Sequence, residues 1–223
     1  MEVVTEAEIG TDGSINWDES GNATGYEISF DGENWELAEN GKDYTEDLTD
    51  ETGTHTIYIR ATNEDEDNYE PSPVVEIQVE VVALKVNVNN ANYGTVDTAT
   101  YNVIKGATYE TSNNTLVVKS NEKTLKTITA TVTEETGYTT TFEGWTSTNG
   151  TINEETEVTA NFTREANPLV FENQTRTVSY NTEAQTVSVT GATNGTGSYT
   201  YTEISEEKGQ EETNYMSING NNN

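Results

Sequence analysis

The chain has 223 residues, no cysteine and a formal charge of −30, from 40 acidic and 10 basic side chains. The lack of cysteine excludes disulfides and thiolate metal sites, and the acidity makes nucleic acid and anionic membranes poor partners because their phosphates repel carboxylates. Thr is abundant (40 residues) and Leu is scarce (6 residues), which favours pleated strands over helices. Two-residue apolar alternation recurs without a sustained helical period, so the sequence predicts an all-β protein.

The strand pattern and the uneven charge divide the chain into three predicted modules, 1–82, 83–165 and 166–223, which we expect to lie end to end. Their net charges are −21 (23 acids, 2 bases), −4 (10 acids, 6 bases) and −5 (7 acids, 2 bases). Such an acidic surface keeps β-modules soluble and discourages pairing of their edges. No segment resembles a signal peptide, and no apolar run approaches the roughly 20 residues that cross a bilayer. We therefore expect either a soluble protein or a segment of a longer exported protein.

Residues 1–82 are expected to form a β-sandwich of short strands separated by polar turns. The predicted strands are 14–17, 25–30, 35–37, 55–61 and 72–79. Alternation directs Trp17, Tyr26, His55 and Ile57 toward the core of this sandwich.

This order of features resembles a fibronectin type III domain. The resemblance rests on Trp17 in the second strand, on Gly-Tyr-x-Ile-x-Phe at 25–30 and on His-x-Ile-x-Ile-x-Ala-x-Asn at 55–63. The family usually has Tyr where His55 lies, and the Tyr hydroxyl ties the strand to the preceding turn. We expect His55 either to make a similar bond through a ring nitrogen or to pack.

Residues 83–165 contain the most specific pattern of the chain. The predicted strands are 84–88, 93–96, 101–104, 116–118, 128–132, 141–145 and 158–162. Phe142, Gly144, Trp145 and Phe162 are predicted core residues: the glycine permits a tight turn, and the large rings fill a core that lacks Leu. Trp145 as a platform for stacking a ligand is the alternative, which the burial statistics of Trp disfavour.

The stretch Val-x-x-Asn-x-x-x-x-Gly-x-Val at 86–96, followed by Gly-Tyr, Phe-x-Gly-Trp and Thr-Ala-Asn-Phe, resembles a Listeria–Bacteroides repeat of the internalin B-repeat type. The resemblance implies a compact sheet with a grasp-like topology that occurs in tandem on bacterial surface proteins.

Residues 166–223 follow a short, polar, Pro-containing junction at 164–168, which predicts a semi-rigid connection. The predicted strands are 169–171, 175–180, 185–189, 198–201 and 215–218. Thr-Val-Ser-Val-x-Gly-Ala at 186–192 and Ser-Tyr-Thr-Tyr at 198–201 resemble the opening of a bacterial immunoglobulin-like domain. Because such a domain needs about seven strands, we expect a partial Ig-like sandwich, either a fragment or a domain that another chain completes with a strand.

Catalysis is not expected. His55 is the one histidine of the chain and is predicted to face the core, so neither a His/Cys metal cluster nor a catalytic triad is foreseen. The acidic runs 43–51 and 64–68 offer oxygen ligands for Ca²⁺, but neither has the spacing of an EF-hand loop. We expect both runs to be solvated loops, with no metal and no cofactor.

The sequence therefore predicts a non-catalytic, multi-module segment of a bacterial cell-surface or secreted protein, which acts as a spacer or stalk, with an additional adhesin role left open. The alternatives are a phage virion structural or fibre-decorating protein and, more weakly, an accessory module of a secreted glycoside hydrolase. The expected partners are a protein or glycan ligand on a cell surface and further modules of the same parent chain. Neither nucleic acid nor membrane insertion is expected, and the predicted location is extracellular, or on a virion under the first alternative.

Overall fold

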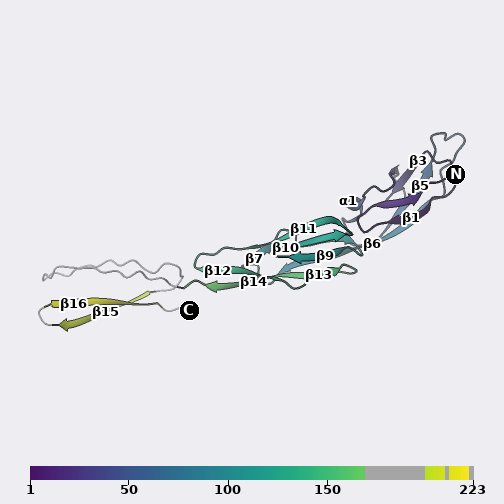
Figure 1. The fold of residues 1–223 in the computed structure, drawn as a ribbon. Helices are drawn as coiled ribbons and strands as arrows, with labels where there is room; N and C mark the ends of the chain where they lie inside the picture. The colour runs from purple at the N-terminus through teal and green to yellow at the C-terminus, as the bar shows by residue number, and fades with distance from the viewer. Residues whose placement is uncertain (169–198, 209–210, 221–223) are drawn as a thin grey trace. The chain divides into compact units, whose positions relative to one another are not determined.

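The computed structural model describes residues 1–168, 199–208 and 211–220 (Figure 1). Over these residues the chain forms sixteen strands and one short helix, which confirms the predicted all-β class. The chain divides into two compact units: residues 1–132 with 142–162, and residues 133–141 with 163–223. None of the described helices is long and apolar enough to span a membrane.

The first part of the first unit runs as far as a long strand, β6. Its elements are β1 (Thr5–Ile9), β2 (Ile15–Asp18), β3 (Gly25–Ser29), β4 (Glu36–Leu37), α1 (Thr45–Leu48), β5 (Gly53–Thr62) and β6 (Val75–Val88). The strands that follow are β7 (Gly94–Val96), β8 (Thr100–Ile104), β9 (Thr108–Ser112), β10 (Thr115–Ser120), β11 (Lys123–Val132), β12 (Tyr138–Trp145), β13 (Asn149–Thr151) and β14 (Thr156–Ala166). A hairpin of β15 (Tyr199–Lys208) and β16 (Glu211–Gly220) belongs to the second unit.

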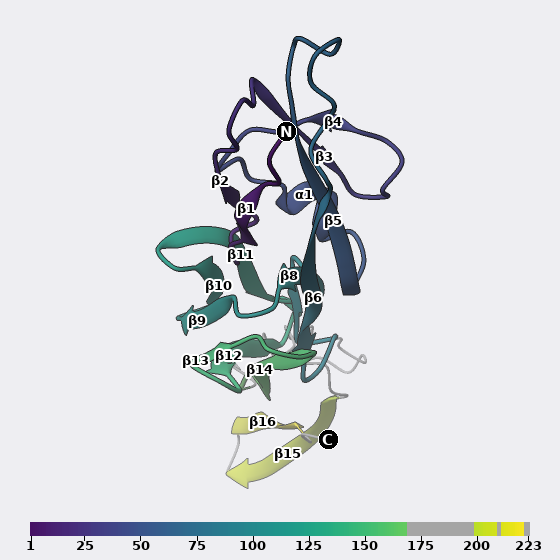
Figure 2. The same cartoon turned by 90° about the vertical axis from the view of Figure 1, so that its right-hand side faces the viewer.

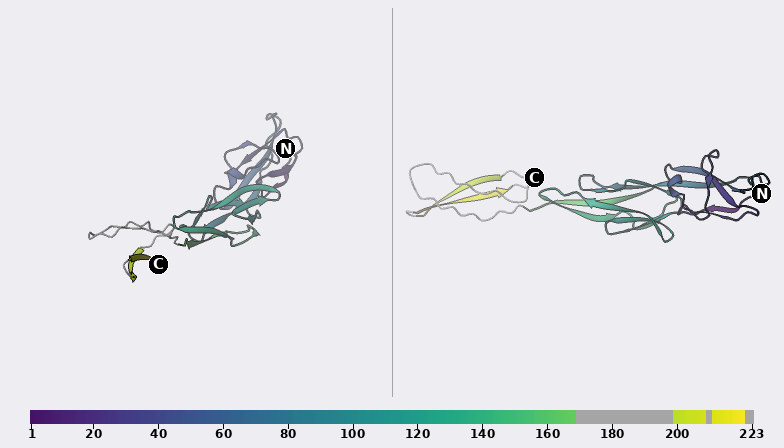
Figure 3. Two further views of the ribbon diagram at one scale, coloured as in Figure 1. Left: turned by 60° about the vertical axis from the view of Figure 1, so that its left-hand side comes forward. Right: turned by 90° about the horizontal axis from the view of Figure 1, so that it is seen from above.

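The strands form two larger and two smaller sheets. The larger ones have the orders β12-β14-β6-β5-β3-β4, with β8 also paired to β6, and β13-β9-β10-β11-β7. The smaller ones are the pairs β1-β2 and β15-β16. β14 pairs with β6 in parallel, whereas the pairs of β6 with β5 and with β8 are antiparallel. Figure 3 shows strands of the first unit, teal to green, running side by side.

β6 is shared by two hydrophobic cores, one on each of its faces. Ile77 and Val79 belong to the first core, whereas Val82 and Leu84 belong to the second. Successive side chains of a strand point to opposite faces, so the odd-numbered residues serve one core and the even-numbered residues the other. Every residue from Val81 to Leu84 is buried, where the strand leaves one core for the next. Figure 2 shows β6 running from β5 toward β8 and β14.

The alternation pattern predicts 72–79 and 84–88 as separate strands of two modules, but in the structure residues 75–88 form one strand, β6. The sandwich pattern of 1–82 and the pattern of 83–165 therefore meet inside β6 rather than at a linker. Two neighbouring residues of β8 are divided between the cores in the same way: Val103 belongs to the second core and Ile104 to the first.

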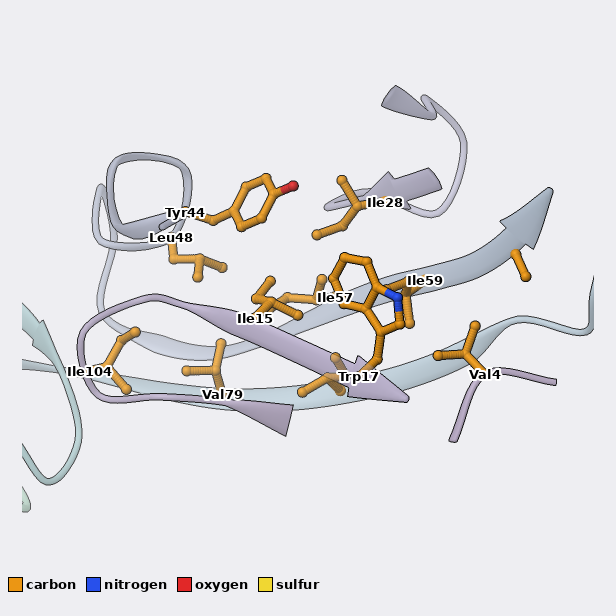
Figure 4. Packing of buried hydrophobic residues seen from close by; sticks show 12 residues of the cluster. Val4, Ile15, Trp17, Ile28, Tyr44, Leu48, Ile57, Ile59, Val79 and Ile104 are labelled. Carbon is orange, nitrogen blue, oxygen red and sulfur yellow. The ribbon is translucent and has the colours of Figure 1, made fainter. Parts of the chain in front are cut away.

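The first core surrounds Trp17, which is 5% exposed (Figure 4). Ile57 and Ile59 of β5 are fully buried beside it, and the ring of Tyr26 lies tilted against the indole with the centroids 5.2 Å apart.

Among the strands predicted for 1–82, those at 14–17, 55–61 and 72–79 alternate toward their ends as expected. The strand at 25–30 does not, because Ile28 and Ser29 are both buried, and Leu37 of the strand at 35–37 is 78% exposed. α1 was not foreseen because four residues are too few to show a helical period.

The second core is continuous with a smaller aromatic cluster around Phe162, which is 1% exposed. The Phe162 ring fills the space beside Gly94: a Cβ atom added to this glycine would lie 2.4 Å from Cζ of the ring. Glycine is therefore required at position 94 by close approach of the ring.

Polar contacts also join the two parts of the first unit. Lys123 Nζ lies 2.7 Å from Asp43 Oδ2, and Asn102 Nδ2 donates to the carbonyl oxygen of Thr49 at 2.9 Å. Burial acts to raise the pKa of Asp43, but the hydrogen bonds from Lys123 and Thr45 outweigh it and hold the pKa below its ordinary value. The parts on either side of β6 thus contact each other through side chains as well as through the strand.

In the second unit, Arg164 ties the predicted junction to β12 and to the loop before it. Its side chain is 6% exposed, and it donates to the carbonyl oxygen of Thr133 at 2.8 Å and to Thr140 Oγ1 at 3.0 Å. The amide of Asn167 donates to the carbonyl oxygen of Gly137 at 2.8 Å. Of the strands predicted for 166–223, those at 169–171, 175–180 and 185–189 lie outside the described residues.

Asp43→Asn should lower the free energy of unfolding at neutral pH by at most about 1 kcal/mol, because an exposed ion pair stabilises weakly. The folded-state pKa of Asp43 lies below its unfolded-state value, so this contribution is present above about pH 4 and is lost as the pH falls through the folded-state pKa. Urea denaturation should therefore show a difference between the variant and the native chain near pH 7 and none at strongly acidic pH. Asp18→Asn, at an exposed position of β2, is the matched control. A difference for Asp43→Asn that persists in acid would contradict the ion-pair origin.

Candidate functional site

A shallow hollow of about 620 Å³ opens on the first unit beside Trp145. Two segments that are distant in sequence form it: the end of β9 with the turn to β10, and the C-terminal end of β12 with the loop that follows it. The lining residues are Thr111, Ser112, Asn113, Asn114, Phe142, Glu143, Gly144, Trp145 and Thr148.

The β9–β10 turn is built on two asparagines. Asn113 has φ of +51°, a left-handed conformation that Asn adopts more readily than most residues. Asn114 Nδ2 donates to the carbonyl oxygen of Ala130 at 2.9 Å, which fixes the turn to β11. Both side chains are exposed at the rim of the hollow.

Trp145 is held in place by this turn and by an aromatic cluster. The indole Nε1 donates to the carbonyl oxygen of Asn113 at 3.1 Å. Phe142 meets the indole edge-on with centroids 5.7 Å apart, and Phe142 in turn contacts Phe162 at 5.4 Å. The indole is therefore half-buried and fixed, with part of its surface lining the hollow.

Gly144 leaves the floor of the hollow open. Its φ is +132°, which L-residues with a side chain rarely adopt. A Cβ atom built at this glycine would meet nothing within 4 Å. The backbone conformation, rather than close packing, requires glycine here, and the missing side chain enlarges the space next to Trp145.

Thr111 and Thr148 line one side of the hollow, and hydrogen bonds to backbone carbonyl groups hold them in place. The amide of Thr111 donates to the carbonyl oxygen of Thr148 at 2.7 Å, and Thr111 Oγ1 donates to that of Ser147 at 3.0 Å. With Glu143 as its charged lining residue, the hollow combines one aromatic surface with amide, hydroxyl and carboxylate groups. This set suits an uncharged ligand that has an apolar face and several hydroxyl groups.

The structure separates the predicted core residues into two groups that do not meet. In the first core Trp17 and Ile57 are buried and Tyr26 is half-buried against them. Around the second core Phe162 is buried, while Phe142, Gly144 and Trp145 are partly exposed at the hollow. Gly144 has a positive φ, but it lies inside β12 rather than in the tight turn that the sequence predicted.

His55 lies outside these clusters and is half-buried. Its Nε2 is 2.9 Å from the carbonyl oxygen of Glu51 in the preceding turn, the hydrogen-bonding role that was one of its two expected roles.

The run 43–51 is not the solvated loop that was expected, because it contains α1, and its Tyr44 and Leu48 are buried in the first core. The run 64–68 lies outside the helices and strands, and carboxylates of both runs accept hydrogen bonds. Both carboxylate oxygens of Asp65 accept from Asn68 Nδ2, at 3.0 and 2.8 Å. Asp43 is bound by Lys123 and Thr45. Within the described part of the chain, no three His, Asp or Glu side chains gather in a way that could hold a metal ion.

The turn residues of the hollow, Asn113 and Asn114, were not predicted as site residues from the sequence. The signal was present, because Asn113-Asn114 between two alternating stretches is typical of a hairpin turn. The proximity of this turn to Trp145 and Thr148 has no local signal, because it arises from the pairing of β13 with β9.

Comparisons with protein families, with curated proteins and with solved structures find no match to this chain. Functional proposals for it therefore rest on the residues and geometry described above.

Proposed function

We propose that the chain is a non-catalytic, multi-module segment of a bacterial cell-surface or secreted protein that acts as a spacer. The observation that carries this proposal is the shared strand β6. One strand passes directly from the first core to the second, with buried residues throughout the passage and polar contacts beside it. A spacer must keep its parts at a fixed separation, and a continuous hydrogen-bonded strand does so better than a flexible linker.

The proposed modules are a fibronectin type III-like domain in 1–82, a Listeria–Bacteroides repeat-like domain in 83–165 and a partial Ig-like domain in 166–223. The parallel pairing of β6 with β14 supports the grasp-like topology proposed for the second module. The same architecture suits a phage virion protein, and the gene neighbourhood of the parent protein distinguishes the two. An accessory module of a glycoside hydrolase is the weaker alternative.

Adhesion is the second candidate function, and the hollow beside Trp145 favours it. The indole is fixed by the bond to Asn113 and is half-buried, and the hollow beside it is lined mostly by uncharged polar groups, with Glu143 as the charged one. An aromatic face stacks on the apolar face of a sugar ring, while Asn and Thr side chains bind its hydroxyl groups. We propose a glycan or a protein loop on a cell surface as the ligand.

The spacer function predicts a narrow distance distribution across β6. Spin labels on Thr54→Cys of β5 and Glu157→Cys of β14, both exposed positions, report the separation of the two cores. We expect the distribution from pulsed electron paramagnetic resonance to be as narrow as that of a pair within the second core, Thr127→Cys with Glu157→Cys. A clearly broader distribution across β6 than within the second core would show a hinge and contradict the spacer function.

The adhesin function predicts that a neutral oligosaccharide stabilises the chain through the hollow. A ligand at 100 times its dissociation constant raises the free energy of unfolding by about 2.7 kcal/mol, which a thermal-shift screen detects. Trp145→Ala should abolish this shift. Trp35→Ala should retain it, because Trp35 lies under Arg60, 4.0 Å from the guanidinium carbon to the ring centroid, and not in the hollow. A shift that survives Trp145→Ala would place the ligand elsewhere.

A further inference from the structure

The second core begins and ends on neighbouring parallel strands. Residues Leu84–Val88 of β6 pair with Thr156–Ala160 of β14. β6 brings the chain in from the first core, and β14 carries it out toward Ala166. Because the strands are parallel, tension along the chain pulls β6 backward and β14 forward along their common axis.

We propose that this strand pair is a force-bearing clamp that resists extension of the chain. The hydrogen bonds of a parallel ladder are evenly spaced along the strands. Tension in opposite directions along the strand axis loads them all together, so that the strands must slide before any single bond is released. A ladder pulled apart at one end instead opens one bond at a time.

Asn89 extends the clamp beyond the last strand pair. Its amide donates to the carbonyl oxygen of Ala160 at 3.1 Å. Its side chain then reproduces the pattern of a further backbone pair: Nδ2 donates to the carbonyl oxygen of Phe162 at 2.9 Å, and Oδ1 accepts from the Phe162 amide at 2.9 Å. Sliding of β14 must break these bonds too, and it must also withdraw the buried Phe162 ring from beside Gly94.

The clamp is shielded from water on its inner face. Leu84 and Val86 of β6 are buried, as are Val158 and Ala160 of β14. A hydrogen bond in such surroundings is stronger than one in water, and water cannot replace it before the core opens. β6 is also paired with β8 over Val81–Lys85, so the strand that receives the load is held on its other edge.

The biological use of the clamp rests on the proposed spacer function, because only a chain under tension needs it. The mechanical resistance itself does not depend on that function and is measured on the purified chain.

Single-molecule pulling on the full chain tests the clamp. The chain has no cysteine, so two introduced cysteines are the sole attachment points. Glu80→Cys, at an exposed position four residues before the part of β6 that pairs with β14, is common to both molecules. The second handle is the exposed Glu165→Cys, which loads the ladder in shear, or the exposed Glu154→Cys before β14, which peels it from one end.

We expect the shear geometry to need at least about twice the force of the peeling geometry at the same loading rate, because the bonds break together rather than in turn. Forced unfolding reports the unfolding barrier rather than equilibrium stability, so the comparison is direct. Equal forces in the two geometries would overturn the proposal, and so would a larger force on peeling.

Asn89→Ala should lower the shear force and leave the peeling force nearly unchanged. Asn40→Ala is the matched control, because the Asn40 side chain makes the same two bonds to an aromatic residue away from the load: Nδ2 to the carbonyl oxygen of Trp17 at 2.8 Å, and Oδ1 from the Trp17 amide at 3.1 Å. An equal loss of shear force in both variants would overturn the role of Asn89. If Asn89→Ala fails to fold, the comparison of geometries on the native side chains still decides the proposal.

The two proposals fail in distinguishable ways. A broad distance distribution across β6, together with a shear force well above the peeling force, would contradict the spacer function and support the clamp. A narrow distance distribution with equal forces in the two pulling geometries would support the spacer function and contradict the clamp.

Discussion

The described structure of this chain depends on one strand that serves two hydrophobic cores. Because side chains alternate along a strand, β6 buries Ile77 and Val79 on one face and Val82 and Leu84 on the other. Neither core can lose β6 without losing part of its wall. The polar contacts between Asp43 and Lys123 are weak by comparison, since exposed ion pairs contribute little.

The same strand explains the arrangement of the second core. β6 arrives already paired with β5, and β14 then adds to it in parallel, so the chain enters and leaves this core on adjacent strands. Phe162 at the end of this pair anchors the aromatic cluster through Phe142, and Phe142 in turn supports Trp145 at the hollow. The proposed load-bearing pair and the proposed ligand site therefore share one aromatic cluster.

Much of the fold was predictable from alternation. Ile15 with Trp17, and Ile57, Ile59 and Ala61 of β5, are buried as their spacing indicates. A two-residue period assigns every second residue of a strand to the same face. The continuity of β6 was not predicted, although Val81-Val-Ala-Leu84 carries a signal. Four consecutive apolar residues break the alternation, and a strand that changes cores must be buried on both faces at that point.

The hollow was less predictable. Large aromatic residues usually serve cores, yet Trp145 lies at the end of a strand where the neighbouring turn determines its exposure. The partners of Trp145 and Asn89 are 32 and 73 residues away in sequence. Such pairings follow from sheet topology, on which local spacing carries no information.

Amide hydrogen exchange at the middle of β6 tests most directly whether this strand joins the two cores without a hinge. We expect the hydrogen-bonded amides from Val81 to Lys85 to exchange with a free energy within about 1 kcal/mol of that of global unfolding, because both cores must open to release them. Exchange of these amides through a local opening of far lower free energy, with Ile77–Val79 and Val86–Val88 still protected, would show that β6 bends between two independent cores.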